Sequence, residues 1–174
     1  MKDSISPLDG RYSSETEDLL PYFSERALIR YRIKVEIEYL IALSKEKTLV
    51  DLPVFTKKQE ATYRKIYSNF NASAAKEVKK VEQKTNHDVK AVEYYIRSKV
   101  NKSIHPWVHF ALTSEDVNNL SYTLMWRDAL KKIYIPQLTQ FLKDLKTLSN
   151  KYADTAMLSM THGQPATPTT FGKE

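Results

Sequence analysis

Residues 113–152 read TSEDVNNLSYTLMWRDALKKIYIPQLTQFLKDLKTLSNKY. Apolar side chains recur through this segment at helical spacing, and Thr113 or Ser114, followed by two acidic residues, is suited to cap its N-terminus. Pro136 is expected to kink the helix without ending it. A helix of about 40 residues, against the usual 11 or 12, cannot bury its apolar stripe alone. The segment therefore predicts a helical bundle to which other subunits contribute.

Helical patterns also fill the chain upstream of this segment. The spacing of apolar residues predicts a helix from Ser24 to about Lys47. Thr56 with Gln59 three positions later is a capping-box pattern that opens a second helix. Ser73 is expected to cap a third helix, and Asp88 a fourth.

No segment shows convincing strand alternation, so the expected fold class is all-α. We expect a small helical N-terminal domain at residues 1–110, and the first part of a long-helix bundle domain at residues 111–174. The C-terminal residues look like the start of another element, which suggests that the chain is the N-terminal part of a longer protein.

Glycine is rare in this chain, with 3 in 174 residues, and average usage of about 7% would give roughly twelve. Two of the three lie in residues 10–11, Gly-Arg, and 162–163, His-Gly. Glycine permits tight turns and close approach to a ligand, and the prolines after Gly163 oppose a helix. We therefore expect His162 on an ordered, non-helical segment after the long helix, a common place for a catalytic side chain.

The bulk composition excludes several classes of protein. The hydrophobic content of 41% and charged content of 28% are typical of a globular chain, and there is no cysteine for a disulfide or thiolate. No apolar run approaches the length of a membrane span, and the N-terminus, Met1–Ile5, lacks an apolar signal core. A cytoplasmic protein that does not bind membranes is the expectation.

The formal net charge of +6 is compatible with a solvated surface, with nucleic-acid binding, or with attraction of small anions. The lysines are spread along helical faces, and no block of five like charges occurs. Nucleotide-binding and hydrolase signatures such as G-x-x-x-x-G-K-[ST] and G-x-S-x-G are absent. An all-helical interaction or nucleic-acid-binding module stays open as an alternative to an enzyme.

Histidine is the side chain best matched to proton transfer near neutral pH. Three of the four histidines, His87, His109 and His162, lie beside short polar groups at an expected helix start or loop, which favours a site over three separate structural roles. His105 and His109 are four apart, but Pro106 disfavours a helix at His105 and no acidic or cysteine ligand is near. No metal site is expected.

Two expected helix starts, at Asp88 and at Thr113 or Ser114, present backbone N–H groups that suit phosphate or carboxylate, although ordinary capping explains such residues equally well. Arg11, beside Gly10, is a further candidate anion ligand through its guanidinium fork.

Four segments together resemble the adenylosuccinate lyases of the fumarase/aspartase superfamily. They occur in the family's order, and the likeness extends over the whole chain: residues 6–12, SPLDGRY; 85–94, TNHDVKAVEY; 109–120, HFALTSEDVNNL; and 161–168, THGQPATP.

The resemblance implies a reaction: β-elimination of fumarate from adenylosuccinate and from the related succinyl-carboxamide intermediate of purine synthesis. It implies that His162 is the general acid and that His87 is a second active-site histidine. Substrate-binding positions are implied at Arg11, Tyr12, Asn86, His87, Asp88, Thr113 and Ser114, with His109 a weaker candidate. It implies no cofactor, a small anionic nucleotide as substrate, and a homotetramer with shared active sites.

The chain departs from the family pattern at Met160, where an arginine is expected before the Thr-His-Gly-Gln motif. The family's serine base and the rest of its bundle would lie beyond Glu174. A chain that stopped there would be an inactive fragment with exposed apolar stripes.

Overall fold

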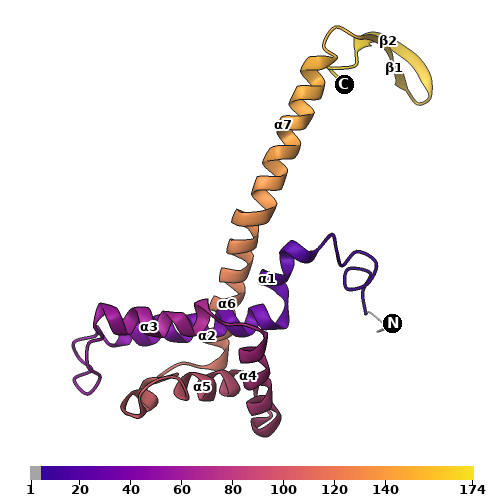
Figure 1. Ribbon diagram of the computed structural model, residues 1–174. Helices are drawn as coiled ribbons and strands as arrows, with labels where there is room; N and C mark the ends of the chain where they lie inside the picture. Colours follow the sequence, from indigo (N-terminus) through magenta and orange to yellow (C-terminus); the bar gives the residue numbers. More distant parts are fainter. Residues whose placement is uncertain (1–4) are drawn as a thin grey trace. The chain divides into compact units, whose positions relative to one another are not determined.

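The structure is a computed structural model that describes residues 5–174 (Figure 1). The chain divides into two compact units, Met1–Ala129 and Leu130–Glu174. The predicted domain boundary near residue 110 stays a prediction. Apart from Ile5, the N-terminal stretch whose sequence argues against a secretion signal lies outside the described residues.

The first unit is helical throughout its regular structure. Two short 3-10 helices, Glu17–Leu19 and Lys102–Trp107, accompany α1 (Leu20–Phe23), α2 (Glu25–Leu43), α3 (Lys57–Ser68), α4 (Ala72–Thr85), α5 (Asp88–Arg97) and α6 (Ser114–Ala129).

Helix α2 is the centre of this unit, because every other α-helix of the unit contacts it. Figure 1 shows α3 running alongside α2. Ile33 and Ile37 of α2 are fully buried in the main apolar core, and Val35, elsewhere on the same helix, packs with buried residues of α5 and α6 in a second cluster. An element buried against several neighbours can fix the spacing between them, and the candidate site depends on this property.

Two of the predicted helices start as expected. Ser24, where the helical pattern begins, caps α2 by accepting the Ala27 N–H, and Thr56 forms the predicted capping box with Gln59. The predicted cap at Ser73 is wrong, because α4 begins two residues earlier and Asn71 accepts the Ala74 N–H. Helix α2 ends at Leu43, before the predicted end near Lys47.

The second unit begins with a π-helical segment, Leu130–Tyr134, which leads directly into α7 (Ile135–Lys151). Proline has no N–H, and its ring crowds the carbonyl four residues earlier, so a wider turn just before Pro136 accommodates it. The helix continues past the proline as predicted. None of the described helices is long and apolar enough to cross a membrane.

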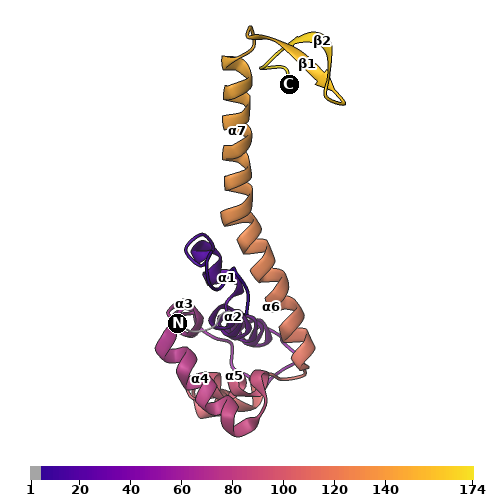
Figure 2. The ribbon, with the colours of Figure 1, turned by 90° about the vertical axis from the view of Figure 1, so that its right-hand side faces the viewer.

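After α7 the chain forms a two-stranded antiparallel hairpin of β1 (Ala156–Thr161) and β2 (Gln164–Thr170), visible in Figure 2. The expectation that no segment forms a strand is wrong here. Pro165 and Pro168, the prolines that oppose a helix, lie in β2, opposite Met160 and Leu158. Proline is tolerated there because each strand of a two-stranded sheet is an edge strand.

The hairpin packs on the C-terminal end of α7. The Phe171 ring meets the Tyr152 ring edge to face at 5.2 Å, and the Ser149 hydroxyl donates to the Gly172 carbonyl at 2.5 Å. Gly172 itself donates to the Tyr152 carbonyl at 2.9 Å. A Cβ at position 172 would overlap the backbone carbonyl of Ser149, so there is no room for a side chain larger than that of glycine at this position.

Candidate active site

The corner between α4 and α5 holds three of the predicted binding residues. Asn86 ends α4 in the left-handed conformation, with φ 50° and ψ 33°, and this reverses the chain within one residue. His87 and Asp88 follow directly, and both side chains are half exposed. The corner lines a pocket of about 640 Å³ together with Lys79, Glu82 and Gln83.

The predicted cap at Asp88 is wrong, because His87 occupies the cap position and Asp88 is the first residue of α5. The Lys90 N–H donates to His87 Nδ1 at 3.2 Å, and Asp88 Oδ1 accepts the Val89 N–H at 2.8 Å. Since Nδ1 is an acceptor, the neutral ring carries its proton on Nε2 and presents a donor on its outer side. These first-turn N–H groups are therefore occupied by the helix's own side chains rather than free for an anion.

Arg32 of α2 joins this corner to α6. Its Nη2 lies 2.7 Å from Asp88 Oδ2, and its Nε donates to Asn118 Oδ1 at 2.9 Å. Partial burial raises the pKa of Asp88, but the Val89 N–H and the Arg32 guanidinium outweigh it, so the pKa lies below its ordinary value. Asp88 is therefore ionised and fixed in place at neutral pH.

One turn further along α2, Glu36 meets His109. His109 Nδ1 lies 2.5 Å from Glu36 Oε1, and the Glu36 carboxylate is almost fully buried. The hydrogen bond to Glu36 raises the pKa of His109; burial lowers it, the charges of Glu36 and Glu93 raise it further, and Lys90 opposes them. The net shift is upward, so the pair favours a protonated ring.

The predicted cap at Thr113 is confirmed. The Thr113 N–H and hydroxyl both donate to Asp116 Oδ2, at 2.7 and 2.8 Å, and the Asp116 N–H donates back to the hydroxyl at 3.4 Å. Ser114 is then the first residue of α6. Both predicted binding residues thus stand at the start of the helix that carries Asn118.

Two predicted binding residues, Arg11 and Tyr12, lie in the turn-rich segment before the first 3-10 helix. The Arg11 guanidinium lies 5.4 Å from the centre of the Tyr12 ring. Within residues 5–174 no hydrogen bond or ion pair joins either side chain to the α4–α5 corner or to the start of α6.

His162 lies in the second unit, at the tip of the hairpin. Thr161 pairs with Gln164, and the two residues between them, His162 and Gly163, have φ of 50° and 74°. Two positive φ values in a two-residue loop define a type I′ turn. The expectation of an ordered, non-helical place for His162 is confirmed, and the ring projects from an exposed turn.

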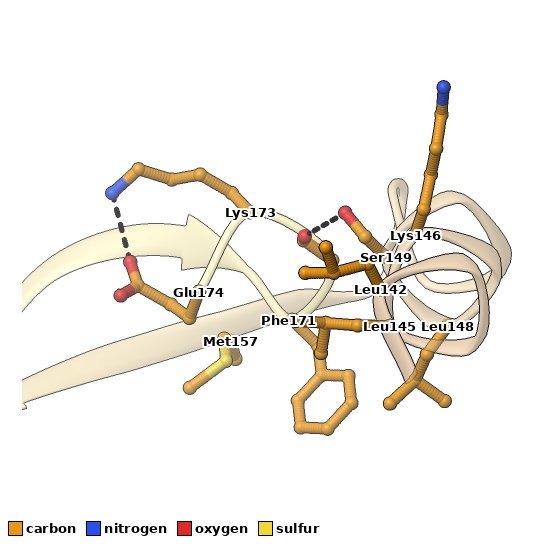
Figure 3. A pocket seen from close by; sticks show the side chains of 10 residues that line it. Leu142, Leu145, Lys146, Leu148, Ser149, Met157, Phe171, Lys173 and Glu174 are labelled. Carbon is orange, nitrogen blue, oxygen red and sulfur yellow. Dashed lines mark hydrogen bonds and ion pairs between the residues drawn. The ribbon is translucent and has the colours of Figure 1, made fainter. Parts of the chain in front are cut away.

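The second unit also has an apolar pocket of about 630 Å³ between α7 and the end of the hairpin (Figure 3). Leucines of α7, Met157 and Phe171 line it, and the Lys173–Glu174 ion pair lies at its edge. His162 is not among the lining residues. This mostly apolar lining suits packing against other side chains and not a reaction.

Among the described residues no group of three or more His, Asp or Glu side chains could hold a metal ion. His105 Nε2 lies 3.3 Å from the Val100 carbonyl, while His109 faces Glu36, so the two histidines have different partners.

Sequence reasoning missed Arg32, Glu36 and Asn118. Arg32 and Glu36 stand among other charged residues of the same helix, such as Arg30, Lys34 and Glu38, so the sequence does not show which of these charges are buried. Asn118 gives no signal either, because an asparagine on the first turn of a helix is ordinary.

A protein-family model described as "Lyase" matches residues 10–174. The chain belongs to this lyase family. Proteins named adenylosuccinate lyase are 46% identical to the lyase chain over 99% of its length in Legionella pneumophila (strain Corby), 45% over 98% in Dictyostelium discoideum and 39% over 98% in Escherichia coli (strain K12). The lyase chain spans only 38–39% of the length of these relatives.

Solved structures share the fold of the lyase chain. A fumarate lyase from Mesorhizobium sp. BNC1 superposes with a TM-score of 0.70 at 18% identity, over 90% of this chain and 35% of that one. A 3-carboxy-cis,cis-muconate lactonizing enzyme from Pseudomonas putida gives 0.65 at 22% identity, over 90% of this chain and 34% of that one. These likenesses, with the mostly helical structure, confirm the predicted fold class.

Proposed function

We propose that the chain is the N-terminal part of an adenylosuccinate lyase. The enzyme would release fumarate from adenylosuccinate, giving AMP, and from the succinyl-carboxamide ribonucleotide of purine synthesis, giving the free carboxamide. The observation that carries the proposal is 39–46% identity over almost the whole chain to proteins of that name.

The reaction assigns a role to His162. A base takes a proton from the carbon next to a carboxylate, the electron pair forms the new double bond, and the C–N bond breaks. The departing exocyclic nitrogen then needs a proton, which the His162 imidazole would donate as general acid. Such a donor contributes about 10²–10⁴-fold to the rate. The base, a serine, would come from sequence beyond Glu174.

The other candidates would bind the substrate. His87 offers a donor from Nε2, because its Nδ1 is engaged by the Lys90 N–H. Asn86, Asp88, Thr113, Ser114, Arg11 and Tyr12 would complete the binding site, with His109 in a supporting role. A phosphate and two carboxylates on the substrate suit a chain of net charge +6.

The assembly would be a homotetramer with active sites shared between subunits. The support is α7, which has no buried residue although leucines and a phenylalanine recur along it. Neighbouring helices would cover this stripe. We further propose a cytoplasmic enzyme that needs neither metal nor cofactor and binds no nucleic acid.

The test measures conversion of adenylosuccinate by the full-length enzyme from its absorbance. His162→Asn removes the acid but suits the turn, because Asn-Gly is the favoured type I′ pair. We expect kcat to fall about 10²-fold or more. His105→Asn removes an imidazole outside every candidate position and should leave kcat unchanged. Full activity of the His162→Asn enzyme would reject the assigned role, and an inactive wild type would reject the proposed function.

A further inference from the structure

We propose that Arg32 is a positioning residue of this active site: its guanidinium fixes the Asn86–Asp88 corner against the first turn of α6. The inference rests on the proposed function. Arg32 would not touch substrate. It would act through the residues at either side of it, which include five of the candidate binding positions: Asn86, His87, Asp88, Thr113 and Ser114.

The buried guanidinium of Arg32 contacts one residue of α5 and one residue of α6. The side chain is 6% exposed, its Nη2 lies 2.7 Å from Asp88 Oδ2, and its Nε donates to Asn118 Oδ1 at 2.9 Å. Three helices far apart in the sequence, α2, α5 and α6, thus meet on a single planar cation. The fork of the guanidinium sets both the separation and the angle between its two partners.

Both partners are also held on their far sides. Asp88 Oδ1 accepts the Val89 N–H at 2.8 Å, and Asn118 Nδ2 donates to Glu115 Oε1 at 3.0 Å. Neither group can rotate to follow a displaced cation without losing its second bond. A displacement of Arg32 would therefore displace Asp88 and Asn118, and a shift of Asp88 would move the adjacent His87 ring.

A second arginine that bonds to another helix, Arg64, provides a comparison. Arg64 of α3 grips both carboxylate oxygens of Glu38 on α2, at 2.8 and 2.9 Å, and also reaches Glu60 at 3.1 Å. It joins two helices where Arg32 joins three, it contacts no candidate site residue, and its side chain is 40% exposed. Arg64→Gln is therefore the matched control for loss of an interhelical arginine.

The experiment compares Arg32→Lys, Arg32→Gln and Arg64→Gln in the full-length enzyme. Lysine keeps the charge for Asp88 but lacks the second arm of the fork. We expect both Arg32 variants to lose about 10²-fold in kcat/KM with most of the loss in kcat, as for misplacement of reacting groups by about 1 Å. Hydrogen exchange of the amides at residues 88–90 should accelerate in the same variants, while Arg64→Gln leaves both readouts at wild-type values.

A merely structural role predicts a different pattern. Arg32→Lys and Arg32→Gln would then lower the melting temperature, but kcat and KM per folded enzyme would stay at the wild-type values, and this result would overturn the proposal. If Arg32→Gln does not fold, Asn118→Ser removes only the α6 arm, and an unchanged kcat/KM there would count equally against it. If the wild type has no lyase activity, the proposed function fails. Hydrogen exchange then tests by itself whether Arg32 positions the corner, because unchanged protection of the amides at residues 88–90 in Arg32→Lys would overturn the positioning role.

Discussion

His109 has a left-handed backbone, with φ 65°, and faces charged groups from three helices. Glu36 comes from α2, Glu93 and Lys90 from α5, and the charge of His109 is felt by Asp116 of α6. Glu36 and Glu93 are each 2% exposed, so water screens them little. The His109 imidazole thus interacts electrostatically with charged groups of α2, α5 and α6.

The pKa of His109 lies above 6.5 in the folded chain, chiefly because of its hydrogen bond to Glu36. Its contribution to the free energy of unfolding is therefore fully present below about pH 6.5 and is lost as the pH rises through the folded-state pKa. We expect the stability of the wild type to fall, relative to His109→Gln, as the pH rises above about 6.5 in urea titrations. In the Glu36→Gln background, the proteins with and without His109→Gln should have the same dependence of stability on pH. Parallel pH profiles of the wild type and His109→Gln would contradict the prediction.

Gly163 takes φ 74° in the hairpin turn, with open space around its Cα. The penalty for a side chain there is conformational and not steric, about 1–2 kcal/mol for an L-residue in this region. We expect Gly163→Ala to lower the stability of the hairpin by that amount, measured from amide exchange of β1 and β2. His162→Asn should leave the same amides protected, because asparagine tolerates the left-handed conformation.

At the scale of elements, the joint between α7 and the hairpin depends on Gly172. Any side chain there meets backbone atoms of Ser149, Tyr152 and Ala153, and backbone cannot move aside as a side-chain tip can. We expect Gly172→Ala to detach the hairpin from the helix, with loss of the nuclear Overhauser contacts between Tyr152 and Phe171. Retained ring contacts in that variant would contradict the prediction. Lys173→Ala, next to it, alters only an exposed ion pair and should preserve them.

At the scale of the whole molecule, the exposed stripe of α7 is the feature that most needs a partner. Six apolar side chains of this helix are between 40% and 59% exposed: Ile135, Leu138, Phe141, Leu142, Leu145 and Leu148. Such a surface marks an interface. We expect the full-length enzyme to sediment as a tetramer and Leu142→Asp with Leu145→Asp to yield smaller species. Lys143→Asp should change nothing, and tetramers of unaltered stability in the double variant would contradict the proposed assembly.

Much of this architecture could be predicted, because helix periodicity and capping are local. Thr56 and Thr113 cap the helices they were expected to cap, since a short polar side chain reaches the N–H groups of its own first turn. The hairpin could not be predicted by the same reasoning. Its β2 strand contains two prolines, which only an edge strand accepts, and the pattern itself does not reveal that it is an edge.

The candidate site divides in the same way. The helices, the polar corners between them and the histidine beside a glycine follow from the order of residues alone, since each depends on neighbours within about four residues. The contacts of Arg32 with Asp88 and Asn118, and of Glu36 with His109 73 positions along the chain, arise from the packing of the helices. Those contacts depend on how α2 is buried among its neighbours, and that arrangement is a property of the packed core and not of any one segment.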